Sequence, residues 1–235
     1  MTAQQLTWSA LEGRLPLARA DRGIVALPEH RLLYVKNQKA GSSTLMVWLN
    51  RLHTGDFDDP LRHMHRDNGL PKVADLGADT VLAMLAGDAY RFSFVREPLR
   101  RLESVYRAKL FRDLRFRRRV IAKRLGLSPD PDVFVSFEEF LEAVERQAPA
   151  EMDRHWRPQH LNLLHPVITL DRVGRLESFD ADLERIVEES GVPRIPVEPR
   201  NVAPSKPEQS VYDGRPDLRA RVESLYATDM ELYGY

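Results

Sequence analysis

The sequence contains no cysteine among its 235 residues. This absence excludes a disulfide framework, a cysteine-ligated metal site and catalysis by a thiol. No stretch approaches the roughly 18 consecutive apolar residues of a membrane-spanning helix, and the first residues do not have the basic and apolar segments of a secretory signal. We therefore expect a cytoplasmic protein without a membrane span.

An excess of charge of either sign is also absent, because 35 Lys and Arg residues balance 35 Asp and Glu residues. The chain as a whole therefore has no field that would attract nucleic acid, and we expect no nucleic-acid partner. Hydrophobic residues make up 43% of the sequence, which is enough for a full core. No pattern in the sequence indicates the oligomeric state.

The most informative stretch runs from Leu32 to Leu52. Its first four residues form a short apolar run, typical of a parallel strand that is covered on both faces. A loop of small and polar residues follows, and apolar residues then return at helical spacing. A loop that opens a helix binds anions, because the first helical N–H groups lack partners and the helix dipole is positive there. The residues of this loop are Lys39, Ala40, Gly41, Ser42, Ser43 and Thr44.

A second strand and helix follow in the same order. Alternating apolar residues predict a strand over 90–95, and Pro98 suits the first turn of the next helix because it lacks an N–H that would have no partner there. Arg96 lies at the end of the strand, while Arg101 and Ser104 share one face of the helix. A guanidinium fork and a hydroxyl suit a terminal phosphate; the alternatives are a structural ion pair for Arg96 and a back-bonded hydroxyl for Ser104.

Strands that alternate with helices predict an α/β fold. We expect a single domain with a central parallel sheet flanked by helices, a P-loop-like phosphate loop, and the ligand at the carboxyl ends of the strands. Residues 1–30 are expected to form a lead-in at the edge of this domain, which itself covers residues 31–235.

The second half of the chain has weaker patterns. Ser136 and Glu139 form a predicted capping box at the start of a helix. Residues 167–170 and 173–176 resemble two short strands, and apolar spacing predicts a closing helix over 217–232.

The order of residues in the phosphate loop argues against a nucleotide triphosphatase. A Walker-type loop places its lysine after the second glycine, beside a hydroxyl that holds magnesium. Here Lys39 precedes Gly41, which is the only glycine of the loop. Sulfuryl transfer suits this arrangement, because a sulfuryl group carries less negative charge than a phosphoryl group and moves without a metal clamp. A lysine that reaches the bridging oxygen offsets the charge left on the departing phosphate.

These two motifs resemble those of one enzyme family. Residues 39–44 resemble the 5′-phosphosulfate loop of sulfotransferases that use 3′-phosphoadenosine 5′-phosphosulfate (PAPS). Residues 94–98 with Arg101, Ser104, Tyr106 and Lys109 resemble their 3′-phosphate motif, in which an arginine precedes a serine by eight positions. Further resemblance to the carbohydrate sulfotransferase branch, sulfotransferase family 2, lies in residues 155–158, 173–180 and 225–235.

The resemblance implies transfer of a sulfuryl group from PAPS to a hydroxyl of a carbohydrate or another glycosylated small acceptor, without a metal. Lys39 is then catalytic and binds the donor with the rest of its loop, while Arg96, Arg101 and Ser104 bind the 3′-phosphate. The reaction also needs a base, for which histidine has a suitable pKa. His65 is our first candidate and His63 our second; the others are His53, Asp67 and Glu97.

Three questions stay open at this point. The chain is alternatively a P-loop-like kinase of a small hydroxyl acceptor, or a non-catalytic module that binds polyanions through the basic residues 112–124. For that basic stretch we favour a structural explanation over polyanion binding. In it, the charged side chains form a solvated face of a helix whose apolar stripe packs on the core. His155 and Trp156 contribute either to a ligand pocket or to the core.

Overall fold

The computed structural model describes residues 6–58, 68–200 and 209–235. The chain forms two compact units. The first comprises Met1–Val95 and His160–Val202, and it contains the sheet. The second comprises Arg96–Gln159 and Ala203–Tyr235, and its described part is helical. The chain passes between the units directly after a strand, between Val95 and Arg96.

The sheet confirms the predicted α/β class. Its four strands lie in the order β1-β2-β3-β4, with β2 parallel to β3 and β3 parallel to β4. The first strand pairs antiparallel with β2, so the sheet is mostly rather than wholly parallel. The strands are β1 Ile24–Leu27, β2 Leu32–Val35, β3 Tyr90–Val95 and β4 Arg172–Arg175.

The first strand begins within the predicted lead-in. All four residues of β1 are buried, as are those of β2, so both strands contribute to the core. A tight turn over Pro28–His30 joins them, and Arg31 turns the chain back with a left-handed φ of 45°. This strand was not predicted, because its apolar run is as short as that of β2 and is not followed by the loop and helix that mark β2.

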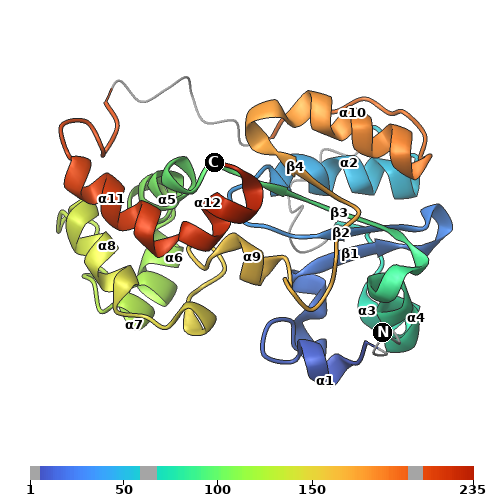
Figure 1. Ribbon diagram of the computed structural model, residues 1–235, viewed down its shortest axis with the longest axis horizontal. Coiled ribbons are helices and arrows are strands. Elements are labelled where there is room, and N and C mark those ends of the chain that lie inside the picture. The colour runs from blue at the N-terminus through green and yellow to red at the C-terminus, as the bar shows by residue number, and fades with distance from the viewer. Residues whose placement is uncertain (1–5, 59–67, 201–208) are drawn as a thin grey trace. The chain divides into compact units, whose positions relative to one another are not determined.

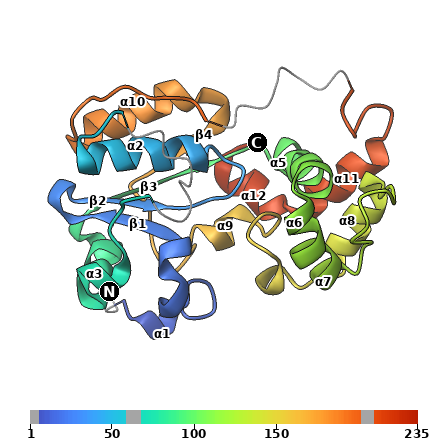
Figure 2. The same ribbon diagram turned by 180° about the vertical axis from the view of Figure 1, so that it is seen from behind.

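Two helices cover one face of the sheet (Figure 1). They are α2, Ser42–Thr54, and α10, Phe179–Ser190, and both contribute to the core cluster that includes β2 and β3. In that cluster Phe92 contacts Tyr34 at 5.2 Å and Trp48 at 6.3 Å between ring centroids. Figure 2 shows the short helices of the opposite side, which are α1 Trp8–Leu11, α3 Val73–Leu76 and α4 Ala78–Ala83.

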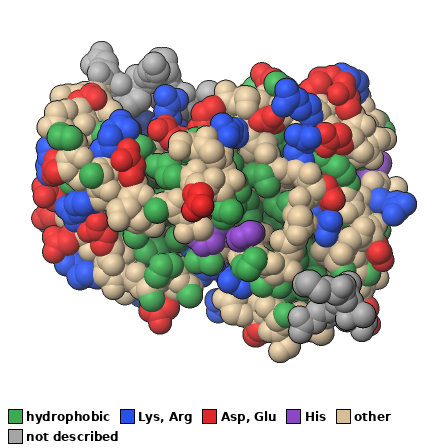
Figure 3. All heavy atoms as spheres, in the orientation of Figure 1, with side chains coloured by type: hydrophobic (Ala, Val, Ile, Leu, Met, Phe, Trp, Pro, Cys, Tyr) green, Lys and Arg blue, Asp and Glu red, His purple; other side chains and the backbone are tan. Residues whose placement is uncertain are grey.

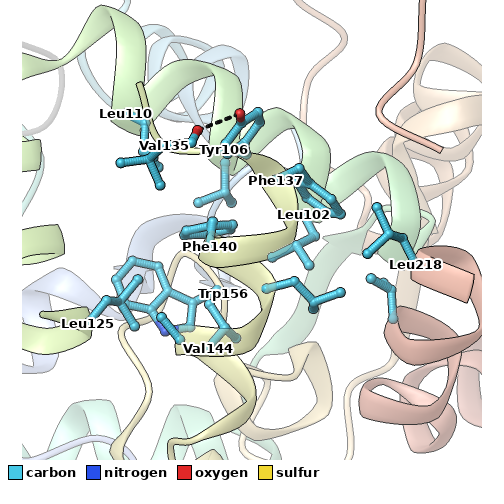
Figure 4. Close-up of a cluster of buried hydrophobic side chains, with 14 of the residues drawn as sticks. Leu102, Tyr106, Leu110, Leu125, Val135, Phe137, Phe140, Val144, Trp156 and Leu218 are labelled. Atoms are coloured by element: carbon cyan, nitrogen blue, oxygen red, sulfur yellow. Dashed lines mark hydrogen bonds between the residues drawn. The ribbon is translucent and has the colours of Figure 1, made fainter. Parts of the chain in front are cut away.

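The second unit packs its helices around a separate core (Figure 4). Trp156 and Phe140 lie at its centre, both fully buried, with Tyr106 donating a hydrogen bond to the carbonyl of Val135. The predicted capping box is present at α8, with Ser136 Oγ accepting from Glu139 N. The helices are α5 Pro98–Tyr106, α6 Leu114–Phe116, α7 Ala122–Leu125, α8 Phe137–Glu145, α11 Pro216–Leu225 and α12 Ala227–Tyr233, with π-helical turns over Arg107–Arg112 and Arg117–Ile121.

Two predicted elements differ from those observed. Residues 167–170 form no strand, since a turn and a bend at residues 167–168 lead into irregular backbone, so only β4 is present where two strands were predicted. The closing helix is divided into α11 and α12 at Tyr226, whose φ of −112° and ψ of 24° leave the helical region. Tyr226 is buried and donates its hydroxyl to the carbonyl of Trp156 at 2.6 Å, a contact that accompanies this break.

Gly174 in β4 provides a test of the first core. A Cβ added there lies 2.6 Å from Phe94 Cε1 and 3.0 Å from Asp182 Cβ. We expect Gly174→Ala to lower the free energy of unfolding by about 1–3 kcal/mol, because the phenyl ring must shift within a packed core. Urea denaturation measures this loss. Gly13→Ala is the control, since nothing lies within 4 Å of its added Cβ; an equal loss in both variants contradicts the explanation.

Candidate active site

The loop after β2 has an unusual backbone. Lys39 has a φ of 70° and Gly41 a φ of 80°, so both lie in the left-handed region. Such a φ is uncommon for a residue other than glycine, and backbone strain of this kind occurs preferentially at functional sites. A side chain on Gly41 would also lie 3.2 Å from both Leu176 and Phe179. The loop is therefore built around one glycine and one strained lysine.

The loop leads into the first turn of α2. Gly41 is the N-cap and offers no side chain to that turn, and the first helical hydrogen bond joins Leu45 N to Gly41 O at 3.1 Å. Helix geometry leaves the N–H groups of residues 42–44 without acceptors inside the helix. The first turn also contains no acidic residue. A 13-residue helix thus presents the positive end of its dipole at the loop.

The hydroxyl of Thr44 has a structural partner. Thr44 Oγ1 accepts a hydrogen bond from Arg200 N at 3.0 Å and donates to Arg200 O at 3.4 Å. This contact ties residue 200 to the start of α2. The hydroxyl of Thr44 is therefore occupied by the backbone, whereas its N–H remains one of the three at the helix start.

Buried amide and hydroxyl side chains anchor the ends of the two central strands. Asn37 is fully buried, donates to Phe94 O at 3.0 Å and accepts from Asn162 Nδ2 at 3.3 Å. Ser93 Oγ donates to Val35 O at 2.6 Å. These contacts fix the point at which the chain leaves β2 for the loop. Asn37 and Asn162 were not identified from the sequence, since their partners are distant along the chain.

Arg96 and Ser104 belong to the second unit. Arg96 is half-buried, and both its backbone N–H and its carbonyl are held by the side chain of Gln159. Ser104 is also half-buried, and its hydroxyl forms no hydrogen bond within the described ranges. The back-bonded arrangement considered for Ser104 is thus not observed.

Arg101 has a different environment from the one expected of a phosphate ligand. It is only 2% exposed, and its guanidinium donates to Arg157 O at 2.9 Å and to Arg154 O at 3.0 Å. Burial lowers the pKa of this guanidinium, while the charge of Asp229 acts in the opposite direction. Arg101 therefore holds the backbone of residues 154–157. Its contact with a phosphate stays a prediction.

Comparison with known sequences decides the family. A profile of the sulfotransferase family matches residues 22–235, which include both motifs. The chain belongs to this family. Carbohydrate sulfotransferase 14 of Homo sapiens is 31% identical over 229 residues, covering 91% of this chain and 60% of the relative. Carbohydrate sulfotransferase 9 of Homo sapiens is 25% identical over 181 residues, covering 71% and 40%.

A third relative covers a similar range. Carbohydrate sulfotransferase 10 of Danio rerio is 25% identical over 248 residues, covering 90% of this chain and 66% of the relative. The chain spans about 60% of the length of the human carbohydrate sulfotransferase 14. No solved structure matches the chain significantly.

The structure describes only some of the residues predicted as candidate bases. His63, His65 and Asp67 lie outside the described residues. His53 Nδ1 lies 2.6 Å from Glu29 Oε1, and Glu97 forms an ion pair with Arg100 at 2.8 Å. Within residues 6–58, 68–200 and 209–235, no group of three His, Asp or Glu side chains is arranged to hold a metal ion. The same ranges contain no helix long and apolar enough to span a bilayer.

His155 adds a further titratable group in the second unit. Its Nδ1 lies 2.7 Å from Asp153 Oδ1, and its ring meets Phe116 edge to face at 4.7 Å. Burial acts to raise the pKa of Asp153, but the hydrogen bond and charge of His155 outweigh burial and lower it. Trp156 is fully buried and donates to Gln147 Oε1 at 2.8 Å. Trp156 is thus a core residue, and His155 is a partner of Asp153.

Gly41 allows a test of the loop. We expect Gly41→Ala to lower the free energy of unfolding by about 1 kcal/mol from the left-handed φ alone, with a further loss from the two contacts at 3.2 Å. Gly55→Ala is a matched control at the other end of α2, since its φ is 68° and nothing lies within 4 Å. Calorimetry with adenosine 3′,5′-bisphosphate should show weaker binding for Gly41→Ala only. Equal binding by both variants contradicts the role of the loop.

Proposed function

We propose that the protein transfers a sulfuryl group from PAPS to a hydroxyl of a carbohydrate acceptor. One observation carries the proposal: a strained lysine precedes the glycine of a loop at the N-terminus of α2, in a chain that belongs to the sulfotransferase family. The printed names of the relatives, which are carbohydrate sulfotransferases, support a carbohydrate acceptor.

The chemistry assigns distinct tasks to the two motifs. The N–H groups of residues 42–44 and the ammonium of Lys39 bind the 5′-phosphosulfate, while Arg96 and Ser104 bind the 3′-phosphate. The acceptor oxygen attacks sulfur as the bond from sulfur to the bridging 5′-phosphate oxygen breaks. Lys39 stabilises the negative charge that develops on this leaving oxygen. The products are the sulfated acceptor and adenosine 3′,5′-bisphosphate.

The acceptor hydroxyl loses a proton during the attack, and a base must receive it. His65 is the first candidate and His63 the second, because an imidazole titrates near neutral pH. Both lie outside the described residues. Independence from metal and a cytoplasmic location likewise stay predictions, which chelation and cell fractionation test.

Substitution of Lys39 or Arg96 tests the proposed reaction. We expect Lys39→Ala to lower kcat by about a hundredfold or more, since the charge on the leaving phosphate loses its counter-charge. Arg96→Ala should mainly raise the KM for PAPS. Transfer of radiolabelled sulfate from PAPS to a panel of glycans measures both parameters. Wild-type turnover by Lys39→Ala with intact nucleotide binding contradicts the proposal.

Lys36→Ala is the control for these variants. Lys36 lies directly after β2, but its Nζ donates to Asp21 O at 2.6 Å. We therefore expect this variant to keep most of the activity. Two further measurements distinguish a kinase. A kinase would require ATP and magnesium for turnover, and its melting temperature would not shift with the bisphosphate.

Polyanion binding is a second candidate function, and the charge distribution favours it. On the face drawn in Figure 3, acidic and basic side chains are interspersed. The basic stretch differs: within the part of the chain that the structure describes, five of its exposed side chains form neither an ion pair nor a hydrogen bond. These are Arg112, Arg115, Arg118, Arg119 and Lys123. Such unpaired cations suit a polyanionic chain such as a sulfated or carboxylated carbohydrate.

The same stretch also has the predicted core stripe. Ile121 and Leu125 are buried, and so is Arg117, which donates to the carbonyls of Ser128 and Val133. Arg117 is therefore a structural residue, and the polyanion hypothesis rests on the five exposed cations alone.

A paired substitution tests this surface. We expect the double variant Arg115→Ala, Arg119→Ala to elute from heparin at a lower salt concentration than the wild type, because two unpaired charges are lost. The control is Arg215→Ala, Arg219→Ala, which removes two arginines that are paired with Glu138, Asp217 and Glu223. If both double variants lower the salt concentration of elution equally, heparin binding depends only on total charge, and the hypothesis of a polyanion-binding surface is wrong.

A further inference from the structure

Gln159 forms an unusual contact with the backbone of Arg96. Its side chain is fully buried. Gln159 Oε1 accepts from Arg96 N at 3.0 Å, and Gln159 Nε2 donates to Arg96 O at 2.8 Å. Both backbone polar groups of one residue are thus held by one amide. The orientation of this amide follows from the contacts, because an N–H needs an acceptor and a carbonyl needs a donor.

The backbone of Arg96 needs such a partner because of its place in the chain. β3 ends at Val95, so the ladder of strand hydrogen bonds does not extend to Arg96. The helix that follows begins at Pro98. Buried backbone N–H and carbonyl groups without partners are costly, and Gln159 satisfies both where the regular structure stops.

Gln159 is itself held by a buried carboxylate. Its backbone N–H donates to Asp229 Oδ2 at 2.6 Å, and Asp229 in α12 is 0% exposed. A chain of hydrogen bonds therefore leads from the C-terminal helix through Gln159 to Arg96. All three residues belong to the second unit.

The segment that carries Gln159 is fixed at several further points. Arg101 donates to the carbonyls of Arg154 and Arg157, and Tyr226 donates to the carbonyl of Trp156. Gln159 therefore lies at the end of a segment whose backbone is held by hydrogen bonds from side chains. This gives its amide a defined position from which to hold Arg96.

We propose that Gln159, held by Asp229, is a positioning residue that orients Arg96 for the 3′-phosphate of the sulfuryl donor. This proposal rests on the proposed function. Gln159 does not contact the nucleotide; it fixes the backbone from which the long arginine side chain extends. A guanidinium that starts from a fixed backbone loses less conformational freedom when it binds a phosphate.

Two nucleotides that differ only in the 3′-phosphate provide the test. Adenosine 3′,5′-bisphosphate carries this group and adenosine 5′-monophosphate lacks it. The Kd for the monophosphate divided by the Kd for the bisphosphate is therefore a ratio that reports the contribution of the 3′-phosphate. We expect Gln159→Leu to lower this ratio by about tenfold, a difference of 1.4 kcal/mol, with little change in the affinity for the monophosphate. Calorimetry measures both affinities. A residue with a purely structural role would weaken both nucleotides alike.

Matched variants separate positioning from general damage. Asp229→Asn keeps an oxygen that accepts from Gln159 N, so we expect it to preserve the ratio, whereas Asp229→Ala should lower it. Gln147→Ala removes another glutamine of the same unit, which contacts Trp156 Nε1 and the carbonyl of Arg124. That control should lose stability and keep the ratio.

If the leucine variant does not fold, the Kd ratio is measured on Gln159→Glu. An ionised carboxylate still accepts from Arg96 N but cannot donate to Arg96 O, so we expect an intermediate ratio. Unchanged ratios in both Gln159→Glu and Asp229→Ala overturn the proposal.

The outcome also distinguishes the two proposals. If the wild type and Arg96→Ala both bind the two nucleotides equally, the proposed function fails. If Arg96→Ala lowers the ratio but the Gln159 and Asp229 variants do not, the function stands and the positioning role fails.

Discussion

The structure depends on buried amide side chains at the points where the hydrogen-bond ladder of the sheet ends. A parallel strand leaves polar backbone groups without partners at its last residues, and burial makes such groups costly. In the first unit, Asn37 satisfies the carbonyl of Phe94. In the second unit, Gln159 satisfies both backbone groups of Arg96. The two amides thus define where each central strand gives way to a segment with a predicted functional motif.

The sequence predicted these motifs and the elements around them because their signals are local. The strand β2 is a short apolar run, β3 alternates apolar and polar residues, and the helices α2 and α5 have apolar residues at helical spacing, so each signal lies within a few residues. β1 was missed because its apolar run of four residues is followed by a turn and not by a loop and a helix. Residues 167–170 are apolar enough for a strand but form none.

The supports of the candidate site were not predictable, because their contacts span long separations in sequence. Asn37 lies 57 residues from Phe94 and 125 from Asn162, and Gln159 lies 63 residues from Arg96 and 70 from Asp229. Helical spacing correctly placed Arg101 one turn before Ser104, yet spacing cannot reveal burial. Tertiary packing turned the guanidinium of Arg101 toward two backbone carbonyls, whereas the hydroxyl of Ser104 forms no hydrogen bond in the described part of the chain.

Hydrogen bonds between distant residues also explain how the strained backbone of Lys39 persists. A left-handed lysine costs free energy, so it persists only where the surrounding contacts determine the backbone. Asn37 fixes the chain before the loop, and Thr44 fixes it afterwards through the backbone of Arg200. The loop is therefore shaped before any anion binds, and a ligand need not supply the free energy of ordering it. Because the shape is preset, substitutions at Asn37 or Thr44 should weaken anion binding without removing any group that contacts the anion.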